Sequence, residues 1–278
     1  MTLAWRLGAQ LVLMRAASAA VLPGVDATNA EVQAIDEARA YLVNLKAECS
    51  GQGVGIDIAV PYGDPAGEIL QEIETRHVDL VVMSTHGRSG LGRWIYGSVG
   101  EKVLAASPVP VLLVRPTGHL PAMERDPVHS SIVVPLDGSA LAEAALPHAE
   151  YLAQRLGGKL VLLRVVEPPG PAFAFPGTVA PSPPHVEPDR EAELYLAVRG
   201  QRISATGIPV QTAVRAGWAA DVIAYGCAEW QPSMIVMATH GRTGVARALL
   251  GSVALEVVRR SPLPVLLIRP VQHAQAQG

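Results

Sequence analysis

The chain has 278 residues, of which 49% are hydrophobic, 17% are charged and 4% are aromatic, and its formal net charge is −3. This apolar share is enough for packed cores and excludes a wholly disordered chain. The slight negative charge and the few aromatic side chains argue against nucleic-acid binding, which depends on basic patches and stacking surfaces. The length suits one large domain or two small ones.

The two cysteines, Cys49 and Cys227, are too few for a disulfide scaffold or a zinc cluster. They indicate a reducing compartment, and we expect a cytoplasmic protein. No uninterrupted apolar run is long enough for a membrane-spanning helix, so we expect no membrane partner. The apolar start of the chain resembles a signal peptide, but Gln10 and Arg15 interrupt it, and the repeat described next explains it better.

An internal repeat divides the chain into two similar parts. Residues 82–88 read Val-Met-Ser-Thr-His-Gly-Arg, and residues 236–242 read Val-Met-Ala-Thr-His-Gly-Arg, 154 positions later. The same offset relates Gly63 to Gly217, residues 97–99 to 251–253, and residues 107–116 to 261–270. Duplication of a whole domain explains this match. We therefore expect two domains, at residues 1–117 and 130–272.

The second repeat alternates predicted strands with predicted helices. We expect strands at residues 131–136, 159–166, 209–214, 233–238 and 263–269, and helices at residues 139–156, 189–205, 221–229 and 252–260. Most of these strands are continuous apolar runs, which is typical of a parallel sheet covered by helices on both faces. The predicted fold class is therefore α/β, with a doubly wound, five-stranded parallel sheet of order 3-2-1-4-5 in each domain.

The first repeat lacks room for its first strand. Residues 8–15 match residues 157–164 of the second repeat, so the preceding strand would lie ahead of Met1. The apolar start is then the end of a helix, at residues 1–7, followed by the second strand. Either the natural chain starts further upstream, or the first domain has degenerated. Loss of this strand would leave the neighbouring strand edges unpaired and half the pocket absent. In both cases we expect the second domain of this sequence to hold the more complete site.

The fourth predicted strand of each repeat leads into a loop that contains glycine. In the second repeat Gly241 follows the strand, and Gly251-Ser252 opens a helix after nine further residues. Glycine lets the backbone approach a ligand closely, and a helix N-terminus attracts phosphate. The loop is either a cradle for an anion or a structural turn followed by an N-cap.

This Gly-x-x-Gly-x9-Gly-Ser pattern resembles the nucleotide-binding loop of the universal stress protein family. The strand that ends in Pro135-Leu136-Asp137 and the last strand, Pro-Val-Leu-Leu-Val-Arg-Pro at residues 110–116, resemble that family too. The likeness extends over both repeats, so the chain is similar to a tandem member whose first copy lacks its first strand. The resemblance implies a stress-response regulatory protein that binds ATP or another adenine nucleotide, mainly at the switch point of its second domain. A Mg²⁺ ion could accompany the bound phosphates, since it needs only generic oxygen ligands.

The resemblance also implies which residues form the site. Asp137 would contact the adenosine, Val165 would line the adenine pocket, and Gly241 with residues 251–253 would hold the phosphates. The residues implied in the second domain are Pro135, Asp137, Val165, Met237, Ala238, His240, Gly241, Gly251, Ser252 and Val253. Their counterparts in the first domain are Met83, Ser84, Gly87, Gly97, Ser98 and Val99.

Several of these residues have a second interpretation. Ser84 and Ala238 stand where the family has glycine. Nucleotide binding survives if the backbone there needs only a small residue, and weakens if it needs a positive φ or a very close approach of phosphate. Asp137 also fits a turn before a helix. His86 and His240 lie either near the phosphates or in capping and packing positions.

Other functions stay open at this point. The sequence has no Walker loop, no dinucleotide fingerprint, no nucleophile elbow and no cluster with metal-site spacing. It also offers no obvious general base for hydrolysis, which leaves enzymatic activity uncertain. The alternatives to a nucleotide-binding regulator are a slow ATP hydrolase and a ligand-free module that acts through protein contacts.

Two further segments invite a prediction. The proline-rich residues 168–188 are either a lid over the pocket or a simple insertion. The last strands of the two repeats are apolar and lie at sheet edges, so we expect them to pair with each other inside the chain. A homodimer of the whole chain is left open.

Overall fold

The computed structural model describes residues 1–18, 26–84, 97–115, 131–167, 189–241 and 250–270. The chain forms two compact units, and each is described by itself. The first comprises residues 1–81 and 86–109, and the second comprises residues 82–85 and 110–278.

The second unit is built on a seven-stranded sheet of order β3-β4-β9-β8-β5-β6-β7. Its strands are β3 (Val81–Ser84), β4 (Val111–Val114), β5 (Ser131–Pro135), β6 (Lys159–Val166), β7 (Val210–Ala216), β8 (Pro232–Ala238) and β9 (Val265–Ile268). The five strands of the second repeat, β5 to β9, are parallel to one another. Their order is the predicted 3-2-1-4-5, with β5 in the centre.

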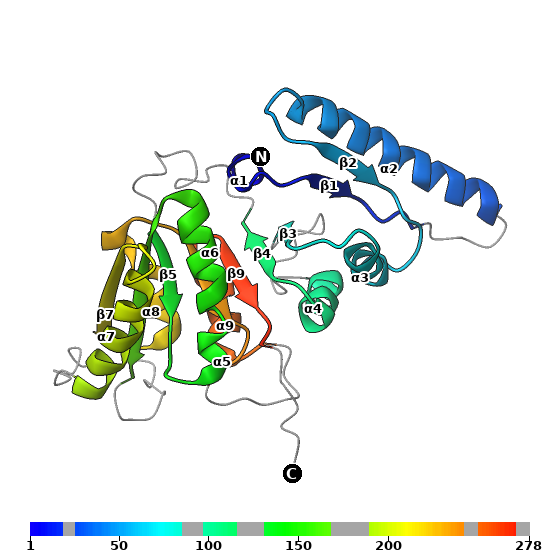
Figure 1. Cartoon of the computed structure of the whole chain (residues 1–278). Coiled ribbons are helices and arrows are strands. Elements are labelled where there is room, and N and C mark those ends of the chain that lie inside the picture. The colour runs from blue at the N-terminus through cyan, green and yellow to red at the C-terminus, as the bar shows by residue number, and fades with distance from the viewer. Residues whose placement is uncertain (19–25, 85–96, 116–130, 168–188, 242–249, 271–278) are drawn as a thin grey trace, which may run out of the picture. The chain divides into compact units, whose positions relative to one another are not determined.

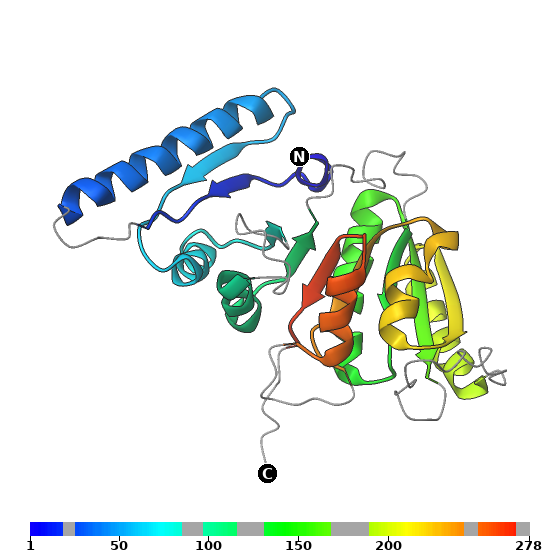
Figure 2. The same ribbon diagram turned by 180° about the vertical axis from the view of Figure 1, so that it is seen from behind.

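Helices cover both faces of this sheet. They are α5 (Ala140–Glu143), α6 (Leu146–Leu156), α7 (Arg190–Ser204), α8 (Ala219–Tyr225) and α9 (Ser252–Arg260), with a short 3₁₀ helix at Ala228–Trp230. α6 and α7 lie on the face seen in Figure 1, and α8 and α9 lie on the face seen in Figure 2. The apolar runs of the central strands are buried between these layers, as a doubly wound sheet requires.

Two helices differ from their predicted bounds. The expected helix over residues 139–156 is two helices, because α5 ends at Glu143 and α6 begins at Leu146. Pro147 lies in the first turn of α6, where its missing N–H costs nothing, whereas a continuous helix would lose a hydrogen bond there. The helix expected at residues 221–229 begins at Ala219 and ends at Tyr225, just before Gly226.

The two repeats meet in this sheet through an antiparallel pair. β4 pairs with β9, and the partners are Val111 with Leu267, Leu112 with Leu266, and Leu113 with Val265. The predicted pairing of the two apolar edges inside the chain is therefore confirmed. It covers backbone groups that would otherwise be a template for association.

The first unit contains α1 (Thr2–Leu7), β1 (Leu11–Met14), α2 (Ala27–Cys49), β2 (Ile56–Ala59), α3 (Pro65–Thr75) and α4 (Gly97–Ala106). β1 and β2 form a parallel two-stranded sheet, and α2 runs alongside it (Figure 1). The helix end and strand predicted for the start of the chain are confirmed as α1 and β1.

The strands that would flank a first strand of the first repeat have one neighbour each in the described residues. β1 pairs with β2, and β3 lies beside β4 at the end of the seven-stranded sheet. The exposure of β3 reflects this edge position, because Val82 is 55% exposed. β8, the equivalent strand of the second repeat, is buried along its whole length.

Candidate functional site

The switch point of the five-stranded sheet lies between β5 and β8. The chain leaves β5 toward β6 on one side and leaves β8 toward β9 on the other, and ligands of such folds bind beyond the carboxyl ends at this point. Asp137 follows β5, and Gly241 follows β8. A Cβ atom added to Gly241 would overlap Oδ2 of Asp137, so the backbone of the loop lies directly against that carboxylate.

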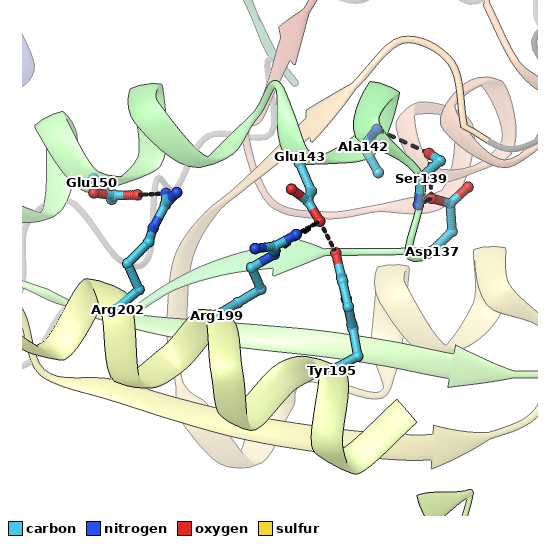
Figure 3. Close-up of polar contacts among 8 residues, drawn as sticks. All are labelled: Asp137, Ser139, Ala142, Glu143, Glu150, Tyr195, Arg199 and Arg202. Carbon is cyan, nitrogen blue, oxygen red and sulfur yellow. Dashed lines mark hydrogen bonds and ion pairs between the residues drawn. The ribbon is translucent and has the colours of Figure 1, made fainter. Parts of the chain in front are cut away.

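The Asp137 carboxylate is held by the turn that follows it. Its Oδ1 accepts hydrogen bonds from the backbone N–H of Ser139 at 2.9 Å and from the Ser139 hydroxyl at 2.6 Å. The same hydroxyl oxygen accepts from the N–H of Ala142 at 3.1 Å and so caps α5 (Figure 3). Gly138 has a φ of 84°, which a side chain would strain. The turn expected at Asp137 is therefore present, and it orients the carboxylate.

The start of α9 is folded back onto the end of β8. The N–H of Gly251 donates to the carbonyl oxygen of Thr239 at 2.8 Å. A Cβ atom on Gly251 would lie 3.3 Å from that oxygen and 3.7 Å from Cα of His240. Glycine therefore permits this close approach, and it brings the N-terminus of α9 to the carboxyl edge of the sheet.

The N-terminus of α9 has the properties of an anion site. Ser252 is its first residue, and no side chain in the described part of the chain caps it. The first N–H groups of a helix have no partner within the helix, and the helix dipole adds a partial positive charge there. Ser252 and Val253 thus present donors where the predicted phosphate position lies.

Ala238 occupies the place of the family's glycine without backbone strain. It ends β8, pairs with Ile268 and is 7% exposed. Among the described non-glycine residues, positive φ occurs at His77 and Gln231, so neither Ala238 nor Ser84 has it. The alternative that depends on a positive φ is therefore removed, and the alternative that depends on a very close approach of phosphate stays a prediction. Met237, the preceding residue, is also buried.

His240 lies between Thr239 and Gly241 at this edge. Its Nδ1 is 3.1 Å from the hydroxyl oxygen of Thr239. The ring is thus held by its sequence neighbour, and the histidine belongs to the loop between β8 and α9.

The β6 side of the edge contains residues that sequence reasoning missed. Val165 pairs with Arg215 near the end of β6, and the N–H of Gly217 donates to the Val166 carbonyl oxygen at 3.1 Å. Oε1 of Glu167 then accepts from the N–H of Ala219 at 3.2 Å and caps α8. Ser139, which the sequence predicts as an N-cap, is confirmed as the cap of α5, and the missed residues on this side are Glu167 and Trp218. The last could have been found by aligning the repeats, because it replaces Asp64.

The other predicted site residues lie in several different elements, and one of them lies outside the described residues. Pro135 ends β5 and pairs with Leu163 of β6. Met83 and Ser84 end β3 in the second unit, whereas Gly97, Ser98 and Val99 begin α4 in the first unit. Gly87 lies outside the described residues. Among the described residues, the structure brings predicted site residues of the second repeat close together, and those of the first repeat fall in different units.

Neither a metal cluster nor a membrane span occurs in the described ranges. No three His, Cys, Asp or Glu side chains there lie together in a way that could hold a metal ion. The described helices include none with the length and apolar character needed to cross a bilayer.

Comparison with known proteins identifies the family of both repeats. The family model described as the universal stress protein family matches residues 1–115 and again residues 129–269. The chain belongs to the universal stress protein family. Both of its repeats are thus universal stress protein repeats.

The relatives of this universal stress protein include bacterial proteins of similar or greater length. A universal stress protein of Mycobacterium tuberculosis is 30% identical over 203 residues, which are 70% of this chain and 63% of that protein. The chain thus spans less than two thirds of the length of this relative. Universal stress protein E of Photorhabdus laumondii is 28% identical over 235 residues, or 78% of this chain and 70% of that protein.

Solved structures share the fold over nearly the whole chain. A universal stress protein from Archaeoglobus fulgidus superposes with a TM-score of 0.72 at 24% identity, covering 95% of this chain and 89% of its own. A functionally unknown protein from Pseudomonas aeruginosa has a TM-score of 0.59 at 17% identity, covering 97% and 85%. A tandem arrangement of this fold is therefore found in other proteins.

Proposed function

We propose that the second repeat binds an adenine nucleotide, ATP in the first instance, at the carboxyl edge between β5 and β8. Through this binding the protein acts as a regulator in the stress response of its family. The observation that carries the proposal is the contact of the Gly241 backbone with the Asp137 carboxylate, beside the N-terminus of α9.

Each part of this edge suits one part of a nucleotide. A carboxylate accepts hydrogen bonds from ribose hydroxyls, so Asp137 is the adenosine contact. The N–H groups of Ser252 and Val253, the Ser252 hydroxyl and the dipole of α9 favour the phosphates. Val165 and Met237 supply apolar contacts for the base. Mg²⁺ would take its ligands from phosphate oxygens and water, since the described residues offer no acidic cluster.

The test is calorimetric titration of the purified full chain with ATP, and Gly241→Ala is the informative variant. Because Gly241 does not have a positive φ, alanine fits the backbone, and its Cβ displaces the Asp137 carboxylate. We expect one ATP per chain in the wild type, since the proposed site lies in the second repeat. In the variant, ATP affinity should fall at least about tenfold, or ~1.4 kcal/mol.

Gly55→Ala is the matched control. A Cβ at Gly55 meets only Cγ of Gln10 at 3.8 Å, and its φ is not positive either. This variant should bind ATP like the wild type and unfold at the same temperature. No binding heat and no thermal shift with ATP in the wild type would refute the proposal. Equal ATP affinity of the two alanine variants would place the nucleotide elsewhere.

Release of phosphate from ATP, measured on the same proteins, separates binding from hydrolysis. Turnover that disappears in Gly241→Ala and persists in Gly55→Ala would make the site that of an ATP hydrolase. Equal background rates in all three proteins would leave a binding function.

A further inference from the structure

The short helix α5 carries the turn that orients Asp137, yet it has little to hold it in place. It has four residues, Ala140–Glu143, and Ala142 is its one buried member. A helix of one turn is unstable by itself, because nucleation fixes several residues for a single hydrogen bond. The position of α5 must therefore be set by contacts with neighbouring elements.

Glu143, the last residue of α5, is the point at which α7 is attached. Its Oε1 accepts a hydrogen bond from the hydroxyl of Tyr195 at 2.8 Å. The same oxygen accepts from Nε of Arg199 at 2.9 Å and pairs with Nη2 of Arg199 at 2.8 Å. Figure 3 shows both α7 side chains pointing to the one carboxylate. We call these three residues the Glu143 anchor.

The Glu143 anchor has the character of a strong polar contact. The side chains of Glu143 and Arg199 are 24% and 32% exposed, so water screens them only in part. The Arg199 guanidinium lies 5.6 Å from the centroid of the Tyr195 ring, within range of a cation–π interaction. Charge-assisted hydrogen bonds are roughly twice as strong as neutral ones.

Both donors of the anchor keep their protons at ordinary pH. Burial raises the pKa of Tyr195 to about 12, and the Glu143 carboxylate adds to this shift. The hydrogen bond to Glu143 raises the pKa of Arg199 above its ordinary value. Tyr195 and Arg199 therefore remain hydrogen-bond donors to Glu143 over the pH range in which nucleotide binding is measured.

Hydrogen bonds connect the anchor to the candidate site. The N–H of Glu143 donates to the carbonyl oxygen of Ser139 at 3.2 Å. The Ser139 hydroxyl in turn accepts from Ala142 and donates to Asp137. A displacement of α5 would thus move the group that orients the Asp137 carboxylate.

We propose that Glu143, Tyr195 and Arg199 are positioning residues for the nucleotide site. They fix α5 against α7 and thereby hold Asp137 in its binding orientation. This inference rests on the proposed function, and it makes α7 part of the site although α7 does not reach the switch point. By linkage, ATP bound at Asp137 must also stabilise the attachment of α7.

The same helix offers a matched control. One turn further along α7, Arg202 pairs with Glu150 at 3.4 Å (Figure 3). Glu150 lies on α6, beyond the break that separates α6 from α5. This second ion pair attaches α7 to the same layer without touching α5.

The experiment measures ATP affinity and thermal stability of the full chain in four variants: Glu143→Ala, Glu143→Gln, Tyr195→Phe and Arg202→Met. We expect Glu143→Ala to weaken ATP binding about tenfold. Glu143→Gln keeps an acceptor oxygen and should recover part of the affinity. Tyr195→Phe removes one hydrogen bond and preserves the ring, so it should fold normally and weaken binding a few-fold. Arg202→Met should bind like the wild type even if it is less stable.

Hydrogen exchange adds a readout that a merely structural contact would not change. In the wild type and in Arg202→Met, ATP should slow amide exchange at residues 195–199 of α7. In Tyr195→Phe and Glu143→Ala this slowing should be reduced. Equal ATP affinity and equal protection in Tyr195→Phe, Glu143→Ala and Arg202→Met would overturn the positioning role and leave the proposed function standing. No ATP binding by the wild type would overturn both.

Discussion

At the scale of single residues, equivalent positions of the two repeats perform different tasks. Asp64 caps α3, because its Oδ2 accepts from the N–H of Gly67 at 3.2 Å. Trp218 has the matching place before α8, caps nothing with its side chain and is 43% exposed. Glu167 supplies the missing acceptor at 3.2 Å from the neighbouring strand. Both helices thus satisfy an N–H group at their start, with acceptors from different elements.

Cys227 gives a prediction about thiol reactivity. Burial raises its pKa to about 11, and the charge of Glu229 adds to the shift. Because the thiolate is the reactive form, Cys227 should resist a thiol reagent at pH 8, whereas the partly exposed Cys49 should react. A colorimetric assay should count one fast thiol in the native chain and two in urea. Two fast thiols in the native chain would contradict the prediction.

The same shift predicts a pH dependence of stability. The folded-state pKa of Cys227 lies above its ordinary value of 9.0, so the unfolded chain loses this proton first. The contribution of the protonated thiol is fully present below about pH 9 and is lost as the pH rises toward about 11. Cys227→Ala removes this contribution. The stability difference between wild type and variant, from urea unfolding, should therefore change between these pH values and stay constant below them.

At the scale of elements, α5 depends on its cap. The Ser139 hydroxyl is the acceptor for the N–H of Ala142, and no other side chain of the described residues caps this helix. Ser139→Ala should lower the free energy of unfolding by about 1 kcal/mol, and Ser139→Thr should retain most of it. Urea unfolding provides the measurement. Ser204→Ala, at the exposed end of α7, is the control and should change stability little.

The sequence predicts the bounds of an element best where glycine or proline stands at its ends. β6 and α9 have their predicted bounds, because glycines precede both and prolines follow at residues 168 and 262. β9 starts later than predicted, at Val265, because Leu263 instead donates its N–H to the Ser261 hydroxyl in a turn. The break between α5 and α6 escapes prediction because the apolar spacing continues through it.

The sequence predicts those parts of the candidate site whose position depends only on the order of the strands. Asp137 and Gly241 follow neighbouring parallel strands, so their proximity follows from the strand order. The Glu143 anchor was not predictable in this way. Glu143 lies more than 50 positions from Tyr195 and Arg199, on a different helix, and the rotation of each helix about its own axis depends on side-chain packing. Sequence periodicity states which face is apolar, and it does not fix which polar groups meet beside that face.

At the scale of the whole molecule, a strand of the first repeat, β4, closes one edge of the five parallel strands of the second repeat. β4 covers the edge of β9, and the Arg115 side chain donates to the carbonyl oxygen of Arg259 beside it. The direction of the β9 backbone groups is also known. The carbonyl oxygens of Pro264 and Ile268 accept hydrogen bonds from Ile235 of β8 and from Thr239, which follows β8. Because backbone groups alternate in direction along a strand, those of Val265 and Leu267 point toward β4.

A fragment of residues 129–278 should therefore associate through β9. It keeps the five parallel strands and both helix layers but loses β4, which leaves the N–H groups of Val265 and Leu267 at an open apolar edge. Two copies can pair these edges antiparallel, as β4 and β9 do. Light scattering after gel filtration should give about twice the fragment mass. Leu267→Pro removes a donor that faces β4 and should shift the fragment to the monomer. A fragment that remains monomeric at every concentration would show that β4 is not what keeps this edge closed.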